Sequence, residues 1–177
     1  MKSICTLTIA LLALALAGAA DASKSAGNMI DDSTINATIK ADLIGSKETK
    51  AHYINVETYK GIVQLSGFVA TQAEKDAAGK IAKAVEGVKE VRNSISIGTE
   101  TSLTQKFDDS VTTGKVKAAL IDSKDIKSGQ INVETRGGVV QLSGFVSSDA
   151  MREKAAAIAT RVEGVKQLDN VLQVRPD

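Results

Sequence analysis

Four pairs of polar residues recur along the sequence and are the first candidates for chemistry. The members of each pair are 77 positions apart: Asn55 and Asn132, Glu57 and Glu134, Gln64 and Gln141, Ser66 and Ser143. A serine nucleophile requires a neighbouring base, and no histidine follows His52. The paired residues also alternate with apolar ones, as the polar face of a half-buried strand requires. The pattern therefore favours a polar sheet face over a catalytic centre.

Other signals of catalysis or metal binding are missing from the sequence. It contains no phosphate-binding loop, no His-Glu-x-x-His motif and no nucleophile elbow. With Cys5 as the single cysteine and His52 as the single histidine, a thiolate or histidine metal site is not expected. We assign no catalytic, cofactor-binding or metal-binding residues, and we do not expect an enzyme.

Lysines of the second half form the one candidate contact surface. The density of positive charge is highest between positions 115 and 127, where each lysine could contribute about 1 kcal/mol at an anionic membrane surface. Asp122 and Asp125 dilute this charge, and a solvated helix face is the plainer interpretation. The candidate lipid-contact residues are Lys115, Lys117, Lys124 and Lys127.

An internal duplication determines how these residues are positioned. The stretch from Val63 to Val69 returns unchanged from Val140 to Val146, and the offset of 77 holds without a gap between residues 32–97 and 109–174. A repeat of this regularity indicates two copies of one small domain. We predict domains at 32–97 and 109–174, joined by a linker at 98–108.

Each copy reads as helix, strand, strand, helix, strand. A helix follows Asp32, two strands flank the turn at Gly61, a capping box at Thr71 begins a second helix, and a third strand covers 88–97. This order predicts an α+β fold, with two tandem copies of a two-layer α-β-β-α-β sandwich in which two helices cover a three-stranded sheet. The polar sheet face is then either solvated or in contact with the other copy.

Four glycines are assigned structural roles. Gly67 and Gly144 leave a gap among the apolar residues of the second strand, and we interpret this as close approach of a helix backbone or a bulge. Gly87 and Gly164 follow the second helices and are expected to end them in the left-handed region.

Composition and the N-terminus limit the function further. The chain of 177 residues is 43% hydrophobic and 24% charged with a formal net charge of +1, which does not indicate nucleic-acid binding. Residues 1–22 have the basic start, short apolar core and small residues of a secretory signal peptide, cleaved after Ala22 or Ala20. Residues 23–31 are expected to be a disordered lead-in. Cys5 lies at the wrong end for a lipoprotein, so a free exported protein is expected.

The order of elements, the Leu-Ser-Gly-Phe-Val stretch and the Val-Glu-Gly-Val helix exit resemble the BON domain. Two such domains behind a signal peptide resemble the OsmY-type periplasmic proteins of Gram-negative bacteria. The resemblance implies a periplasmic protein of osmotic or envelope stress that contacts the membrane surface or anionic phospholipid. The alternative that it implies is a chaperone or carrier for unfolded exported proteins.

Overall fold

A computed structural model describes residues 31–49, 53–98, 101–123, 126 and 128–175. The predicted signal peptide and most of the predicted lead-in lie outside these residues, as do His52, Lys124 and Lys127. None of the helices in the described ranges has the length and apolar character needed to cross a membrane.

Two units with the same order of elements follow one another along the chain. The first contains α1 (Asp32–Gly45), β1 (Ile54–Tyr59), β2 (Ile62–Val69), α2 (Gln72–Ala84), β3 (Glu90–Asn93) and β4 (Ser96–Ile97). The second contains α3 (Leu103–Asp122), η2 (Ser128–Gln130), β5 (Asn132–Arg136), β6 (Val139–Ser143), β7 (Phe145–Val146), α4 (Asp149–Thr160), β8 (Gln167–Asn170) and β9 (Gln173–Val174). We call them domain 1 and domain 2.

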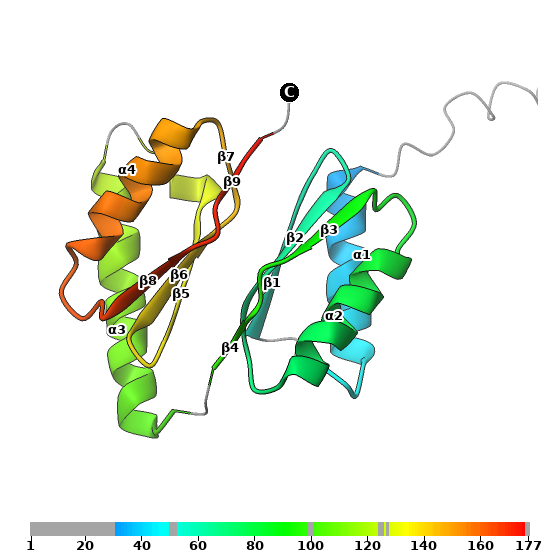
Figure 1. Cartoon of the computed structure of the whole chain (residues 1–177), viewed down its shortest axis with the longest axis horizontal. Helices are drawn as coiled ribbons and strands as arrows, with labels where there is room; N and C mark the ends of the chain where they lie inside the picture. The colour runs from blue at the N-terminus through cyan, green and yellow to red at the C-terminus, as the bar shows by residue number, and fades with distance from the viewer. Residues whose placement is uncertain (1–30, 50–52, 99–100, 124–125, 127, 176–177) are drawn as a thin grey trace, which may run out of the picture.

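The sheet of each domain has the same topology. In domain 1, β2 is central, pairing antiparallel with β1 and parallel with β3 and then β4. In domain 2, β5, β6 and β8 pair in the same way, and β7 pairs with β9. Helices cover one face of each sheet, and the two sheets face each other in the middle of the molecule (Figure 1). The predicted α+β fold of two tandem two-layer sandwiches is therefore confirmed.

Each domain has its own apolar core between helices and sheet. In domain 1, Ile35, Ile39 and Leu43 form one stripe of α1, and each is at most 1% exposed. They pack with Val63 and Leu65 of β2. Alanines at 78 and 82 of α2 complete the layer, because small side chains let a helix approach the sheet closely. Domain 2 repeats this core with Val116, Leu120, Val140, Leu142, Ala155 and Ala159.

The third strand is interrupted, although the sequence predicted one strand over 88–97. The side chain of Asn93 accepts a bond from the Ile95 amide at 3.4 Å and donates to the Lys75 carbonyl of α2 at 2.8 Å. These bonds divert the chain between β3 and β4. Ile97, at the end of the predicted strand, is 53% exposed.

The first helix of domain 2 begins earlier than predicted. Ser102 is its N-cap and accepts a bond from the Gln105 amide at 3.2 Å, so residues 103–108 of the predicted linker are helical. In domain 1, Asp31 caps α1 and bonds to the Thr34 amide at 2.7 Å, which lowers the pKa of Asp31. Asp31 therefore belongs to the folded unit and not to the lead-in.

Asp32 and its repeat counterpart Asp109 do not cap the first helices, and they bind the hairpin turns. Asp109 is 5% exposed, and its two carboxylate oxygens accept the Gly137 and Gly138 amides at 2.8 and 2.9 Å. Asp32 does the same for the Lys60 and Gly61 amides at 2.6 and 2.8 Å. A carboxylate, buried in domain 2 and half-buried in domain 1, thus joins the first helix of each domain to its β-hairpin.

We expect Asp109→Ala to destabilise domain 2 by about 3 kcal/mol, because it leaves two turn amides without their charged acceptor. Asp109→Asn, which keeps one acceptor oxygen, should lose about half as much. Urea denaturation followed by circular dichroism measures both values. A loss below about 0.5 kcal/mol for Asp109→Ala would show that the carboxylate does not support the turn.

Gly67 and Gly144 have φ angles of +106° and +117°. A side chain at either position would collide with the carbonyl oxygen of Tyr53 or Gln130. Gln130 is the last residue of the short helix η2, directly before the edge strand. The backbone that lies close to each glycine therefore belongs to this short turn and not to one of the α-helices. The parallel pairing keeps an offset of 28 on both sides of Gly67, so no residue is inserted and no bulge forms. Gly87 and Gly164 have φ angles of +89° and +98°.

Candidate functional site: a pseudo-twofold docking face

The repeated polar residues lie on the sheet faces that point away from the helices. Gln64 and Ser66 of β2 and Gln141 and Ser143 of β6 are each at most 2% exposed. They are buried against one another, and the sheets of the two domains meet through them. Of the two alternatives left by the sequence, contact with the other copy is the one that the structure shows. We call the eight paired residues the docking face, and the four that each domain contributes form the face of that domain.

Two serines occupy the centre of the docking face. The hydroxyl of Ser66 donates to that of Ser143 at 2.8 Å. On one side of this pair, the Gly144 amide donates to Oε1 of Gln64 at 2.8 Å. On the other side, the Gly67 amide donates to Oε1 of Gln141 at 2.5 Å. The same bond is thus made twice, once in each direction across the interface.

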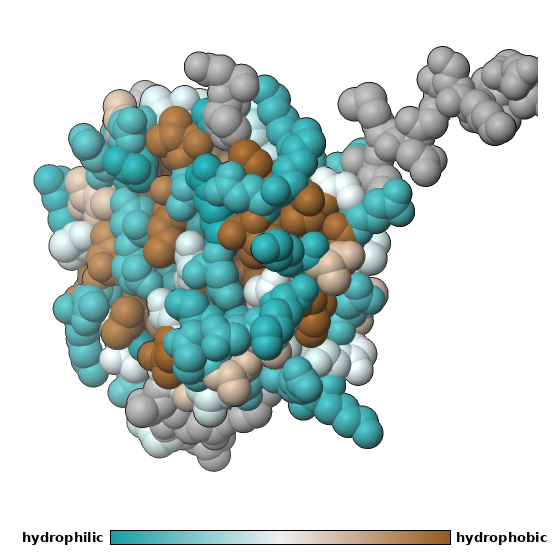
Figure 2. Space-filling model, turned by 45° about the vertical axis from the view of Figure 1, so that its right-hand side comes forward, coloured by the Kyte–Doolittle hydropathy of each residue, from teal (hydrophilic) through white to brown (hydrophobic). Residues whose placement is uncertain are grey.

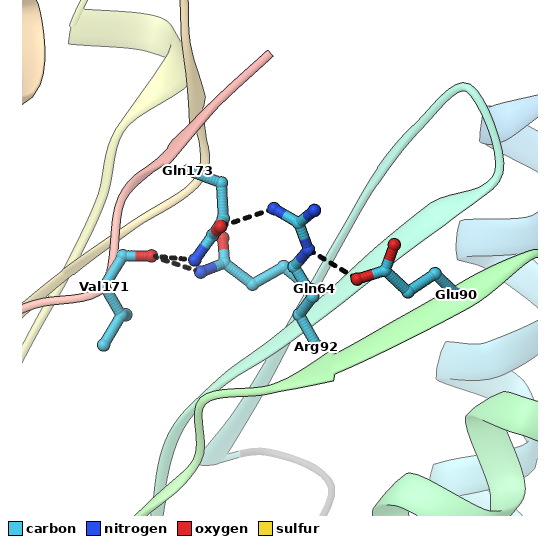
Figure 3. A network of polar contacts seen from close by, with 5 residues as sticks. All are labelled: Gln64, Glu90, Arg92, Val171 and Gln173. Atoms are coloured by element: carbon cyan, nitrogen blue, oxygen red, sulfur yellow. Dashed lines mark hydrogen bonds and ion pairs between the residues drawn. The ribbon is translucent and has the colours of Figure 1, made fainter. Parts of the chain in front are cut away.

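The amide groups of the two glutamines follow the same rule. Nε2 of Gln64 donates to the Val171 carbonyl at 2.5 Å, as Figure 3 shows. Nε2 of Gln141 donates to the Ser94 carbonyl at 3.1 Å. Residues 94 and 171 are 77 positions apart, so these bonds are also equivalent. A buried side-chain amide with all its groups bonded fixes one relative orientation of the two sheets.

The edges of the docking face are paired in the same way. Asn132 donates to Glu57 at 2.9 Å, and Asn55 donates to Glu134 at 3.3 Å. Further out, Tyr59 packs on Phe145 with ring centroids 5.7 Å apart. The equivalent contact places the Arg136 guanidinium 5.9 Å from the ring centre of Phe68.

One equivalent pair uses different residue types in the two domains. Arg92 donates to Gln173 at 2.5 Å, and its Nε atom also bonds Glu90 at 2.8 Å (Figure 3). The equivalent contact is the hydroxyl of Ser96 donating to Asp169 at 2.8 Å. The repeat therefore supplies the positions of these contacts, while sequence divergence has changed their chemistry.

The polar side chains of the docking face are engaged in contacts between the two domains. Ser66 and Ser143 bond each other, and Glu57 and Glu134 are each occupied by an asparagine amide. Among the described residues, no group of three histidine, cysteine or acidic side chains could hold a metal ion. A cavity of about 400 Å³ opens beside the docking face. Its acidic groups, Asp109 and Glu134, already have partners, so we assign no ligand to it.

Sequence reasoning identified the side chains of the docking face but not their partners. It left the backbone amides of Gly67 and Gly144 without a function, and it did not single out Arg92 or Gln173. The contact could have been predicted from the four polar pairs, because each pair has the same residue type in both repeats. A merely solvated face places few constraints on residue type, whereas a face that meets its own copy constrains every position.

A second surface lies on α3, on the side opposite to the core. Phe107, Val111 and Ile121 are 70%, 42% and 65% exposed. They follow a spacing of four and three residues that passes through exposed Gly114 and Ala118, so helical periodicity places all five on one face. We call these five residues the α3 stripe. The prediction missed it because residues up to 108 were assigned to the linker.

The lysines singled out in the sequence stand beside the α3 stripe with different surroundings. Lys115 bonds Glu163 at 2.8 Å, and this bond lowers the pKa of the Glu163 carboxyl. Lys117 is exposed, as is Lys106 on the same side of the helix. The remaining candidates, Lys124 and Lys127, lie outside the described residues. Positive charge therefore flanks the stripe at Lys106 and Lys117.

Among the described residues of domain 1, no comparable stripe is present; Ile30, the counterpart of Phe107, lies outside them. The α1 positions equivalent to Val111, Gly114 and Ala118 hold a threonine and two alanines, and only Ile44, the counterpart of Ile121, is large and apolar. Ile44 is 75% exposed. On the face of the molecule that includes domain 1, hydrophobic side chains are interspersed with hydrophilic ones (Figure 2). Within the part of the chain that the structure describes, the stripe of three large apolar residues thus lies on domain 2.

The fold and the docking face define a protein of two α+β domains joined by a pseudo-twofold contact. The family model of the BON domain matches residues 31–99 and 108–176. The chain therefore belongs to the BON domain family, with two domains in tandem.

Relatives with both domains occur in several bacteria. Osmotically-inducible protein Y of Escherichia coli is 41% identical over 151 residues, covering 84% of this chain and 75% of the relative. Outer membrane lipoprotein DolP of Haemophilus influenzae is 32% identical, covering 85% and 78%. A 21 kDa hemolysin of Actinobacillus pleuropneumoniae is 31% identical, covering 84% and 77%.

Proposed function

We propose that this chain is a non-enzymatic envelope protein of the osmotic stress response, exported to the periplasm, and that domain 2 contacts anionic phospholipid at the membrane surface. Support for the setting comes from the relatives, one osmotically inducible and one an outer membrane lipoprotein. Support for the membrane contact comes from the α3 stripe. This stripe is the observation on which the proposal rests.

The α3 stripe has the composition of an interfacial membrane contact. Three large apolar side chains on one helix face can enter the boundary between headgroups and acyl chains, while Lys106 and Lys117 remain at headgroup level. Burial of one such side chain contributes about 2 kcal/mol, and each lysine about 1 kcal/mol. The apolar residues therefore supply most of the affinity, and the lysines supply the preference for anionic lipid.

The direct test is co-sedimentation with vesicles of phosphatidylglycerol and phosphatidylcholine. The double variant Phe107→Ser/Ile121→Ser removes two apolar anchors, so its partitioning should fall on the order of 1,000-fold. Ile44→Ser is the matched control, because Ile44 is the equivalent exposed isoleucine in domain 1. Equal binding by wild-type protein and the double variant would refute the membrane contact.

Charge is tested separately with Lys106→Glu/Lys117→Glu. We expect a loss of at least tenfold on anionic vesicles and no change on pure phosphatidylcholine, since the substitution reverses charge beside the stripe. Raising the ionic strength should weaken wild-type binding in the same selective way. Binding that does not depend on lipid charge or on salt would contradict an anionic-lipid contact.

The alternative function, binding of unfolded exported proteins, is favoured by the edge strands. β1 and β5 each pair with a neighbouring strand on one side only, and such edges can accept a further strand. Suppression of aggregation of an unfolded outer membrane protein in the absence of lipid would support this alternative. Salt-independent suppression that survives Phe107→Ser/Ile121→Ser would assign it to the sheet edges.

A further inference from the structure

The docking face is isologous, since the bonds of its glutamine and asparagine side chains to the other domain occur twice with the two domains exchanged. Gln64 binds the Gly144 amide as Gln141 binds the Gly67 amide, and Ser66 meets Ser143 at the centre. Contacts of this kind are characteristic of two identical subunits related by a twofold axis. Here the axis passes between two domains of one chain.

At the central positions the two domains present identical groups. Asparagine, glutamate, glutamine, serine and glycine occupy the same places in both repeats. A second domain 1 set in the place of domain 2 would therefore offer Gln64 the amide of its own Gly67, and offer Ser66 another Ser66. Every central donor would keep an acceptor of the same type.

The positions that differ between the repeats also permit like domains to pair. Two copies of domain 1 would place Arg92 opposite Ser96, a donor opposite a hydroxyl oxygen. Two copies of domain 2 would place Asp169 opposite Gln173, a carboxylate opposite an amide donor. Neither pairing brings like charges together at these positions.

We infer that the face of each domain is self-complementary. Its alternative partner is the same face of the same domain in a second copy of this chain. Within one chain the two domains are joined by residues 98–102, and such a short connection gives an effective concentration in the millimolar range. Contact within the chain therefore dominates. When the face of one domain is blocked, the face of the other domain has no partner within its chain. It then pairs with the same face of a second chain.

Blocking one face at a time tests this inference. Ser143→Arg places a large charge at the centre of the domain 2 face, which leaves the domain 1 face without its partner. Ser66→Arg does the reverse, and Ser66→Arg/Ser143→Arg blocks both faces. Light scattering after size-exclusion chromatography, at about 100 µM protein, gives the mass of each variant.

The expected masses are twice the chain mass for both single variants and one chain mass for the wild type and the double variant. Three monomeric variants would overturn the inference, because a freed face would then have no affinity for itself. Three dimeric variants would overturn it as well, because association would not depend on the docking face.

Cysteine cross-linking provides a readout that does not require domain 2 to fold. In a Cys5→Ser/Ser143→Arg background, Ser66→Cys places a thiol on the axis between two docked copies of domain 1. Ser33→Cys, exposed on α1 of the same domain, measures random collision. We expect disulfide-linked dimers to form at least tenfold faster through position 66. Equal rates for the two thiols would contradict pairing through the docking face.

Discussion

Gly144→Ala is expected to destabilise domain 2 by about 4 kcal/mol. The φ angle of +117° lies in a region that only glycine adopts readily. The new Cβ would also meet the Gln130 carbonyl oxygen, a backbone atom that cannot move without disturbing the start of β5. Strain and collision act together, which places this substitution among the most damaging single changes.

Gly114→Ala is the matched control for this prediction. Gly114 lies within α3, is exposed, and has open space where a Cβ would be placed. Alanine should therefore stabilise the helix by about 1 kcal/mol. Urea denaturation of both variants is expected to give changes of opposite sign. A Gly144→Ala variant within 1 kcal/mol of the wild type would show that the close approach to Gln130 is not maintained.

Gln141→Leu is expected to separate the domains while leaving each one folded. The substitution keeps a similar volume but leaves the Gly67 amide and the Ser94 carbonyl without their partners in the interface. Each buried group left unpaired costs about 1–3 kcal/mol, so the contact should lose about 3 kcal/mol or more. Small-angle scattering should show a larger radius of gyration, with the circular dichroism spectrum unchanged.

The control for Gln141→Leu is the same substitution at Gln167, which is exposed on β8. It should change neither the radius of gyration nor the stability by more than about 0.5 kcal/mol. If Gln141→Leu keeps the compact dimensions of the wild type, the glutamine bonds do not hold the domains together.

Much of the fold could be predicted because the same pattern of residues occurs in both repeats. The apolar stripe of α1, the capping box at Thr71 and the alternation around Leu65 each specify a local structure by a pattern of residues. Where two patterns compete, prediction was less accurate. Asp109 has the chemistry of a helix cap, yet its carboxylate bonds the Gly137 and Gly138 amides, and Ser102 caps the helix instead.

The candidate site could be predicted only in part. Alternation identified Gln64 and Ser66 as one polar face, because side-chain direction along a strand has a period of two. Which surface that face meets depends on long-range packing, which periodicity does not encode. Phe107 was missed as part of a surface because a single apolar residue in a presumed linker has no periodic neighbours. Its relation to Val111 and Ile121 appears only when the helix start is known.

Hydrogen exchange of the Gly67 and Gly144 amides, measured by NMR on the wild-type protein, tests the pseudo-twofold contact most directly. Both amides donate to glutamine side chains of the other domain. We predict that both are strongly protected and that Ser66→Arg/Ser143→Arg abolishes this protection, while amides paired within β1 and β2 stay protected. Rapid exchange of the two glycine amides in the wild type, at the rate of an unfolded chain, would contradict the docked arrangement.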